Sequence, residues 1–236
     1  LLFPANPTEC FDFTVIAFDL AERFQTAVIM LTDLDLGMND HLCKPFAWNE
    51  EKKYDRGKVL SAKDLDEMSF GRYLDVDGDG IPYRTIPGTH PTKRSFFTRG
   101  SSRDEYAKYT EDGDVYAKNM DRLVKKWNTA KTQVPAPEIT IHNPNAKIGI
   151  IYFGTSSYAA QETVDLLKEK NILVNEMRML SFPFSNEVKQ FIDQHEQIFV
   201  IEQNRDAQFR SLLMIELDIN PNKLLKVLQY NGMPIT

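Results

Sequence analysis

An α/β fold is predicted for this chain of 236 residues by two features of its hydrophobic pattern. Continuous apolar runs of strand length, such as residues 26–33 and 147–153, are typical of parallel strands that are buried on both faces. Stretches with apolar residues at helical spacing separate these runs, and strands that alternate with helices form parallel sheets with right-handed crossovers. The pattern predicts two domains, residues 1–135 and 145–236, joined by the hinge sequence VPAPE.

The first predicted domain opens with a strand, a helix and a second strand. Residues 1–3 are expected to form a short buried strand, Thr8 to cap a helix over residues 9–25, and residues 26–33 to form a central strand. Three elements cannot close an α/β sheet, and the sequence starts directly with an apolar strand and no methionine. We therefore expect a piece of a longer protein, with further strands upstream or in another chain.

Residues 37–138 are rich in turn residues, and only their last part, with residues 115–133, has the apolar spacing of a helix. A loop-rich segment of this length is usually functional or part of an interface.

The second predicted domain alternates strands and helices regularly, which predicts a three-layer domain with a parallel sheet. The strands are expected at residues 147–153, 171–179, 197–204 and 223–230, and the helices at 158–170, 186–195 and 207–217.

The composition excludes several classes of protein. A formal net charge of −6, from 28 Lys and Arg against 34 Asp and Glu, argues against nucleic acid or anionic lipid as a partner. Cys10 and Cys43 are too few for a disulfide framework or an iron–sulfur cluster, which predicts a reducing, cytoplasmic location. No apolar run approaches the roughly 20 residues of a membrane span, so no membrane contact is expected.

The sequence DVDGDGIPYR, residues 75–84, resembles a calcium loop at its start. Asp75, Asp77 and Asp79 occupy the first, third and fifth ligand positions, but the twelfth position, which should hold a bidentate glutamate, is Ile86. Alternating Asp and Gly residues are also typical of tight surface turns. We therefore favour an acidic turn and keep a weak cation site as the alternative.

Polar residues follow two predicted strands, where parallel sheets bind ligands. GTSS, residues 154–157, suits an anion at a helix N-terminus, although a simple cap and turn would also explain it. Glu202, Gln203 and Asn204 end the third strand of the second domain and could bind a partner or hold the next loop. The four histidines have no metal-site spacing, and neither a nucleophile elbow nor a P-loop is present, so no catalytic residue is predicted.

Four segments in order resemble the alpha subunit of 2-oxoacid:ferredoxin oxidoreductases of the 2-oxoglutarate synthase kind. They are PTECFDFTVIAFDLAERFQTAVIMLTDLDLG, FGRYLDVDGDGIPYRTIPGTH, IGIIYFGTSSYAAQETVDLLKEKNILVNEMRMLSFPF and IFVIEQNRDAQFRSLL. In the second segment, Asp79, Gly80, Arg84 and Pro87-Gly88 match the family pattern, which favours the turn over the cation site. One departure is Arg103, which stands where the family often has a histidine.

This resemblance implies an α/β fold in which part of a thiamine diphosphate pyrimidine-binding domain precedes a transketolase C-terminal-like domain. It implies a full enzyme with a beta subunit, thiamine diphosphate, Mg²⁺ and an iron–sulfur cluster, which acts with CoA and ferredoxin. The family's substrate-binding and cofactor-activating residues belong to segments before Leu1, so we expect this chain alone to bind no cofactor and to be inactive. The residues expected to contact a partner are Arg72, Asp79, Arg84, Glu202, Gln203 and Asn204.

Two other functions stay open at this stage. A non-catalytic assembly module would use the C-terminal domain to bind a partner subunit. A calcium-stabilised surface protein would be built around Asp75, Asp77 and Asp79.

Overall fold

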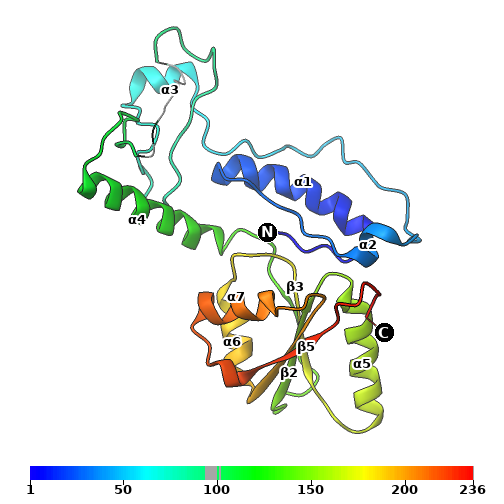
Figure 1. The fold of residues 1–236 in the computed structure, drawn as a ribbon. Coiled ribbons are helices and arrows are strands. Elements are labelled where there is room, and N and C mark those ends of the chain that lie inside the picture. The colour runs from blue at the N-terminus through cyan, green and yellow to red at the C-terminus, as the bar shows by residue number, and fades with distance from the viewer. Residues whose placement is uncertain (94–99, 101, 236) are drawn as a thin grey trace. The chain divides into compact units, whose positions relative to one another are not determined.

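Figure 1 shows a computed structural model of the chain, which describes residues 1–93, 100 and 102–235. The chain divides into two compact units: unit 1 comprises residues 1–17, 28–50 and 134–236, and unit 2 comprises residues 18–27 and 51–133. Unit 1 thus combines residues 1–17 of the first predicted domain with residues 145–236 of the second. The predicted domain bounds, 1–135 and 145–236, stay a prediction.

Unit 1 contains a five-stranded sheet in the order β1-β3-β2-β4-β5. Four of its strands are parallel and lie where the apolar runs predicted them: β2 (Ile148–Phe153), β3 (Asn175–Met179), β4 (Gln197–Glu202) and β5 (Leu224–Leu228). Strand β1 (Glu138–Thr140) pairs antiparallel with β3 and was not predicted. Its three residues are all exposed, so no apolar run marks it as a strand.

Helices cover both faces of this sheet (Figure 1). Helix α5 (Ser156–Glu169) packs on one face through Ala160 and Val164, which contact Ile150 and Tyr152 of β2. On the other face, Ile151 and Phe153 of β2 pack against α6 (Asn186–Gln194) and α7 (Gln208–Leu217). Alternate residues of β2 thus belong to the hydrophobic cores on opposite faces of the sheet, as expected of a strand that is buried on both faces. The prediction of an α/β fold with a mainly parallel sheet is confirmed.

The start of the chain differs from its prediction. Helix α1 (Pro7–Phe24) begins at a proline, and Asn6 Oδ1 accepts a hydrogen bond from Glu9 N at 2.9 Å. Asn6 is therefore the cap, and the assignment of that role to Thr8 was wrong, because proline suits the first helical position and the cap precedes it.

The two strands predicted next to α1 are reduced to isolated bridges. Leu2 pairs with Met30 on one side and Ser181 on the other, and both Leu2 and Phe3 are buried as predicted. The prediction of a central strand over residues 26–33 was wrong, since Ile29 is 55% exposed and the run has only this one bridge within the described residues. A strand needs partners for its backbone groups, and an apolar run alone does not supply them.

Among the residues that the structure describes, three helices lie in the loop-rich segment or overlap its start. Helix α4 (Gly113–Ala130), capped by Asp112, confirms the helix predicted over residues 115–133. The short helices α2 (Leu34–Met38) and α3 (Ala62–Glu67) were not predicted, because one or two turns show no clear periodicity. A 3₁₀ turn, Pro221–Lys223, precedes β5.

Among the described residues, no helix combines the length and the apolar character needed to cross a bilayer.

Candidate functional site

The carboxyl end of β4 carries a fully buried carboxylate. Glu202 has no exposed surface, and its two oxygens accept hydrogen bonds from Phe209 N at 2.9 Å and Arg210 N at 3.1 Å. These amides belong to the first turn of α7, whose N-cap position is Ala207, with a left-handed backbone and no capping side chain. Glu202 therefore supplies the cap from the neighbouring strand, and its negative charge suits the positive end of the helix dipole.

The two residues after Glu202 continue this polar network. Asn204 donates from Nδ2 to the Glu202 carboxylate and accepts at Oδ1 from Gln208 N at 3.2 Å. Gln203 donates from Nε2 to Thr155 Oγ1 at 2.9 Å. The Glu-Gln-Asn sequence thus links the end of β4 to the N-termini of both α7 and α5.

An internal anion occupies the turn that the sequence marked as an anion site. Asp33 Oδ2 accepts hydrogen bonds from Thr155 N at 2.8 Å and Thr155 Oγ1 at 2.7 Å, at the start of α5. Gly154 has a φ of +61°, and a Cβ there would lie 2.7 Å from the same carboxylate oxygen. The GTSS turn, for which the sequence left an anion site and a simple cap and turn open, therefore binds a carboxylate of the protein itself. The sequence did hold a signal for it, since Asp33 ends an apolar run.

A cavity of about 600 Å³ lies at this edge of unit 1. Its walls are largely apolar, and Gln203, Asn204 and Asp33 form part of its polar lining. Aromatic and aliphatic side chains from three elements make the apolar wall, among them Phe3, Phe153, Phe209 and Leu212. The charged oxygens near it already accept bonds within the chain, so the arrangement favours structural contacts over acid–base chemistry.

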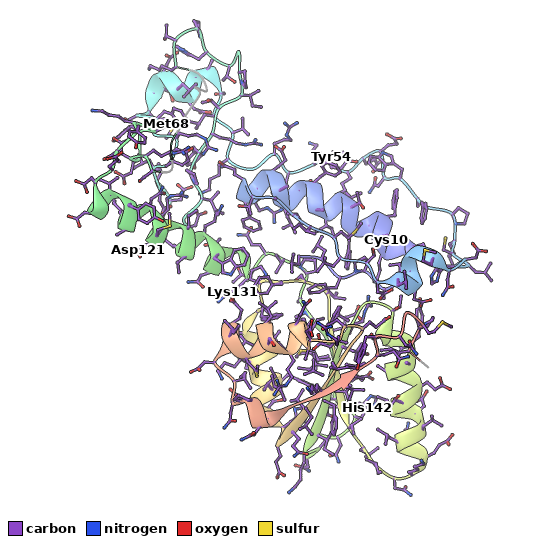
Figure 2. The ribbon with its side chains drawn as sticks, viewed as in Figure 1. Cys10, Tyr54, Met68, Asp121, Lys131 and His142 are labelled. Atoms are coloured by element: carbon purple, nitrogen blue, oxygen red, sulfur yellow. The ribbon has the colours of Figure 1, made fainter. Side chains whose placement is uncertain are left out.

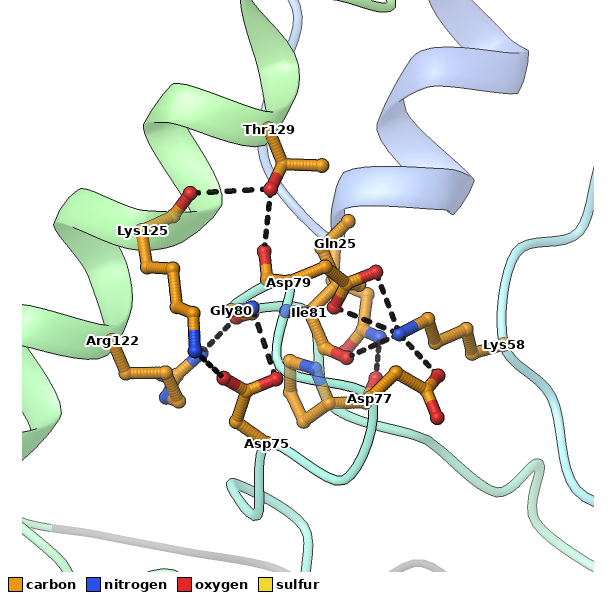
Figure 3. Close-up of polar contacts among 11 residues, drawn as sticks. Gln25, Lys58, Asp75, Asp77, Asp79, Gly80, Ile81, Arg122, Lys125 and Thr129 are labelled. Atoms are coloured by element: carbon orange, nitrogen blue, oxygen red, sulfur yellow. Dashed lines mark hydrogen bonds and ion pairs between the residues drawn. The ribbon is translucent and has the colours of Figure 1, made fainter.

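The acidic turn lies in unit 2 and is held by lysines (Figure 3). Lys58 Nζ pairs with the carboxylates of Asp77 at 2.7 Å and Asp79 at 2.8 Å. The same ammonium donates to the Ile81 carbonyl at 3.0 Å, and Asp79 Oδ1 accepts from Ile81 N at 2.9 Å.

The other end of the turn packs on α4. Asp75 pairs with Lys125 Nζ at 3.1 Å and accepts from Gly80 N at 3.0 Å. The Gly80 carbonyl accepts from Arg122 Nη1 at 2.9 Å, and the Asp79 carbonyl accepts from Thr129 Oγ1 at 2.7 Å (Figure 3). Local sequence gives no sign of these long-range lysine and arginine contacts.

The ion pairs shift the pKa values of this turn. The hydrogen bond from Lys58 is the main cause that lowers the pKa of Asp77, and it outweighs the opposing effect of burial. Burial alone would raise the pKa of Asp75, but Lys125 and the Gly80 amide outweigh it and lower that pKa. Burial would also lower the pKa of Lys58, yet its two aspartates raise it. A bound cation would have to displace these ammonium groups.

The remaining predicted contact residues lie in the same unit as the turn. Arg84 forms an ion pair with Glu22 and donates to the Arg56 carbonyl at 2.9 Å. Arg72 lies over the ring of Tyr73, with its guanidinium carbon 5.2 Å from the ring centre. The structure therefore places Arg72, Asp79 and Arg84 in unit 2, and the Glu-Gln-Asn cluster in unit 1.

The donor set of the described residues does not fit a metal centre of the implied enzyme. No group of three or more His, Cys, Asp or Glu that could hold a metal ion occurs in residues 1–93, 100 and 102–235. Cys10, on α1 (Figure 2), and Cys43 are both free, and two cysteines cannot supply the four thiolates of an iron–sulfur cluster. No step of a reaction is therefore assigned to a cofactor held by this chain.

Comparisons with known proteins point to one family. No protein-family model matches the chain. It is 26% identical to the alpha subunit of 2-oxoacid:ferredoxin oxidoreductase 2 of Aeropyrum pernix, over 100% of this chain and 36% of the relative. It is also 26% identical to the alpha subunit from Saccharolobus solfataricus, over 93% of this chain and 34% of the relative. The chain thus spans about a third of the length of these relatives.

A solved structure agrees at the level of the fold. The 2-oxoglutarate:ferredoxin oxidoreductase of Magnetococcus marinus superimposes with a TM-score of 0.84 at 21% identity, over 100% of this chain and 40% of that chain. That protein was solved with 2-oxoglutarate, coenzyme A and succinyl-CoA bound. The resemblance read from the sequence is therefore confirmed, since the chain is similar over its whole length to the alpha subunits of 2-oxoacid:ferredoxin oxidoreductases.

Proposed function

We propose that this chain acts as part of the alpha subunit of a 2-oxoacid:ferredoxin oxidoreductase. Such an enzyme decarboxylates a 2-oxo acid oxidatively, forms an acyl-CoA and reduces ferredoxin. The observation that carries the proposal is the similarity of the whole chain, in sequence to alpha subunits and in fold to a solved enzyme. The name of that solved enzyme makes 2-oxoglutarate the first substrate to test.

The role we propose for this chain is to bind a partner subunit. The family resemblance implies a beta subunit, thiamine diphosphate, Mg²⁺ and an iron–sulfur cluster in the full complex, and thiamine diphosphate would supply the carbanion chemistry there. We propose that the isolated chain is inactive, because none of its residues matches a substrate-binding or cofactor-activating residue of the family. Its α/β units correspond in this proposal to a partial pyrimidine-binding domain and a transketolase C-terminal-like domain.

Exposed apolar side chains support a partner-binding role. Leu34, Met38 and Leu42 are 55%, 75% and 105% exposed, and Phe46 and Trp48 in the same segment are about half exposed. Several exposed apolar residues on one short segment are typical of a surface that another chain covers. We propose that this segment, residues 29–48, contributes to the interface, together with Gln203 and Asn204 of unit 1 and with Arg72, Asp79 and Arg84 of unit 2. Glu202 was also expected to contact a partner, but it has no exposed surface and is left out of this interface.

The experiment is reconstitution with the beta subunit. Co-expression and affinity purification measure complex formation, and 2-oxoglutarate-dependent, CoA-dependent reduction of ferredoxin measures turnover of the full complex. Leu42→Asp is expected to weaken the complex without unfolding the chain. The control is Leu166→Asp, which alters an exposed leucine of α5 outside the proposed interface and is expected to bind normally. Failure of the wild-type chain to bind any beta subunit would contradict the proposal.

A second candidate function is a non-catalytic assembly module. The exposed segment 29–48 favours it equally, since the segment implies a partner but no chemistry. The two functions differ in one measurement. If the chain binds the beta subunit but its omission leaves ferredoxin reduction unchanged, the assembly function holds; if omission abolishes reduction, the enzyme-subunit function holds.

A further inference from the structure

Helix α4 is attached to the rest of unit 2 through a polar side. Figure 3 shows Arg122, Lys125 and Thr129 on the side of the helix that faces the acidic turn. Arg122 Nη1 donates to the Gly80 carbonyl at 2.9 Å, and Thr129 Oγ1 donates to the Asp79 carbonyl at 2.7 Å. Hydrogen bonds therefore hold this side of the helix on the turn.

The apolar side of α4 is largely exposed. Five large apolar side chains recur at spacings of three and four residues, which places them on one face of the helix. This set, called the α4 stripe below, consists of Tyr116, Met120, Leu123, Val124 and Trp127. Tyr116, Leu123 and Val124 are 48%, 36% and 61% exposed, and the other two side chains are partly buried. Of the 18 residues of α4, all of which the structure describes, only Ala130 is buried.

This orientation is the reverse of the usual one. A helix at the surface of a globular protein normally turns its apolar stripe towards the core and its polar side towards solvent. An exposed set of apolar side chains on one face indicates a surface that another molecule covers. Tyr116 and Trp127 are 11 residues apart, which is about 16 Å along a helix. A narrow apolar stripe of this length suits a second helix.

The stripe carries opposite charges at its two ends. Asp112 is the N-cap residue of α4, and Lys131 is its C-cap residue (Figure 2). At 3.6 residues per turn, both residues lie within about 65° of the middle of the stripe around the helix axis. Asp112 Oδ1 accepts from two amides of the first turn, and this capping leaves its negative charge in place. A helix that binds along the stripe therefore meets a negative end and a positive end.

We propose that the α4 stripe binds the α4 stripe of a second copy of this chain, with the two helices antiparallel. A two-fold axis through the middle of the stripe places Tyr116 of each copy opposite Trp127 of the other. The same axis brings the acidic end of each stripe to the basic end of the other, so that Asp112 faces Lys131. The two helix dipoles are then also antiparallel, which is the favourable arrangement.

The observations favour a second copy because the stripe is complementary to itself. A partner helix must offer an apolar stripe of the same length, with a base and an acid at its ends in the reverse order. An antiparallel copy of α4 meets both conditions, and such a self-complementary surface is what a two-fold dimer requires. About five side chains from each copy make a contact below the standard interface size, so we expect a weak dimer. This inference does not rest on the proposed enzyme function, because self-association is measured on the chain itself.

The test is sedimentation velocity of the full chain at concentrations from about 5 to 500 μM. We expect a monomer–dimer equilibrium with a dissociation constant of about 10–500 μM. Val124→Asp places a charge in the stripe and is expected to raise this constant at least tenfold. The matched control is Ile215→Asp, on α7 in unit 1, where the wild-type side chain is 78% exposed. This control is expected to associate as the wild type does.

A charge variant tests the direction of the two helices. Lys131→Gln removes the base that faces Asp112 in the antiparallel dimer, so we expect a dissociation constant about threefold higher. In a parallel dimer the two copies of Lys131 would lie side by side, and the same change would strengthen association. Lys63→Gln, on the exposed surface of α3 in the same unit, is the control and is expected to have no effect.

Melting temperatures show whether each variant is folded, and Tyr116→Ala replaces Val124→Asp if that variant does not fold. The proposal is overturned if the wild-type chain stays monomeric at about 500 μM. It is also overturned if Ile215→Asp weakens association as much as Val124→Asp, or if Lys131→Gln strengthens it. If Val124→Asp prevents binding of the beta subunit but leaves self-association unchanged, the stripe binds the beta subunit and the second copy is excluded.

Discussion

Glu202 is a carboxylate without exposed surface, and burial of such a charge is costly unless hydrogen bonds compensate for it. The two amides of α7 and the Asn204 side chain provide these bonds. Glu202→Gln keeps the volume but replaces one acceptor oxygen with a donor that faces a helix N–H. We expect a loss of about 1–3 kcal/mol in the free energy of unfolding, measured by urea denaturation.

The matched control is Glu162→Gln, an equal change on the exposed face of α5. Exposed substitutions of this kind usually change stability by less than about 0.5 kcal/mol. If the two variants have the same stability, Glu202 does not hold α7, and only Gln203 and Asn204 are left as candidates for partner contact.

The acidic turn depends on close packing between a glycine and a helix. Gly80 has a φ of +79°, and a Cβ there would lie 2.3 Å from Lys126 N and 2.6 Å from the Arg122 carbonyl oxygen. Gly88 also has a positive φ, +89°, but nothing lies within 4 Å of its Cβ position. We expect Gly88→Ala to cost about 1–2 kcal/mol from backbone strain alone. Gly80→Ala should cost about 1–3 kcal/mol more because of overpacking.

Urea denaturation measures the free energy of unfolding of Gly80→Ala and Gly88→Ala, and hence the difference between their losses of stability. An equal loss of stability in both would show that backbone strain decides the outcome and that the turn does not pack tightly on α4.

The ion pairs of the turn predict how unit 2 responds to acid. The pKa of Asp75 in the folded chain lies below its ordinary value of 3.8, so its contribution to stability is complete above that value. The contribution is lost as the pH falls below 3.8 and through the lower folded pKa, where the carboxylate becomes protonated in both states. We expect Asp75→Asn to be less stable than the wild type near neutral pH and to lose less stability on acidification.

Thermal unfolding at several pH values measures this effect, with Asp121→Asn as the control. Asp121 lies on the exposed side of α4 and forms no ion pair with the described residues, so its variant should follow the wild-type pH profile. Identical profiles for all three proteins would contradict a role for the Asp75 ion pair.

The elements that the sequence predicted well are those with strong local patterns. Strands β2 and β4 are mostly buried apolar runs, and α4 has a clear apolar spacing and an acidic cap. Residues 26–33 show the same apolar pattern as β2, yet they form one bridge, because pairing depends on segments far away in the chain. The partners of the acidic turn, Lys58 and Lys125, lie 17 and 50 residues from Asp75, so no local motif could identify them.

At the scale of the whole molecule, the division into two units predicts that stability is local. The contacts of Gly80 named above lie within unit 2, and those of Glu202 lie within unit 1. Hydrogen exchange reports the opening of each region separately. We expect Gly80→Ala to speed amide exchange in α4 with little effect on β2 and β4, and Glu202→Gln to speed exchange in α7 with little effect on α4.

Mass spectrometry of deuterium uptake in peptides from α4, α7 and β4 measures both patterns, with Gly88→Ala and Glu162→Gln as matched controls. Equal acceleration in all three elements for either variant would mean that the chain opens as one cooperative unit. Local acceleration would mean that each unit has its own stability. A partner that covers only residues 29–48 of unit 1 would then protect unit 1 from exchange without protecting α4, so the same peptides also identify the unit to which a partner subunit binds.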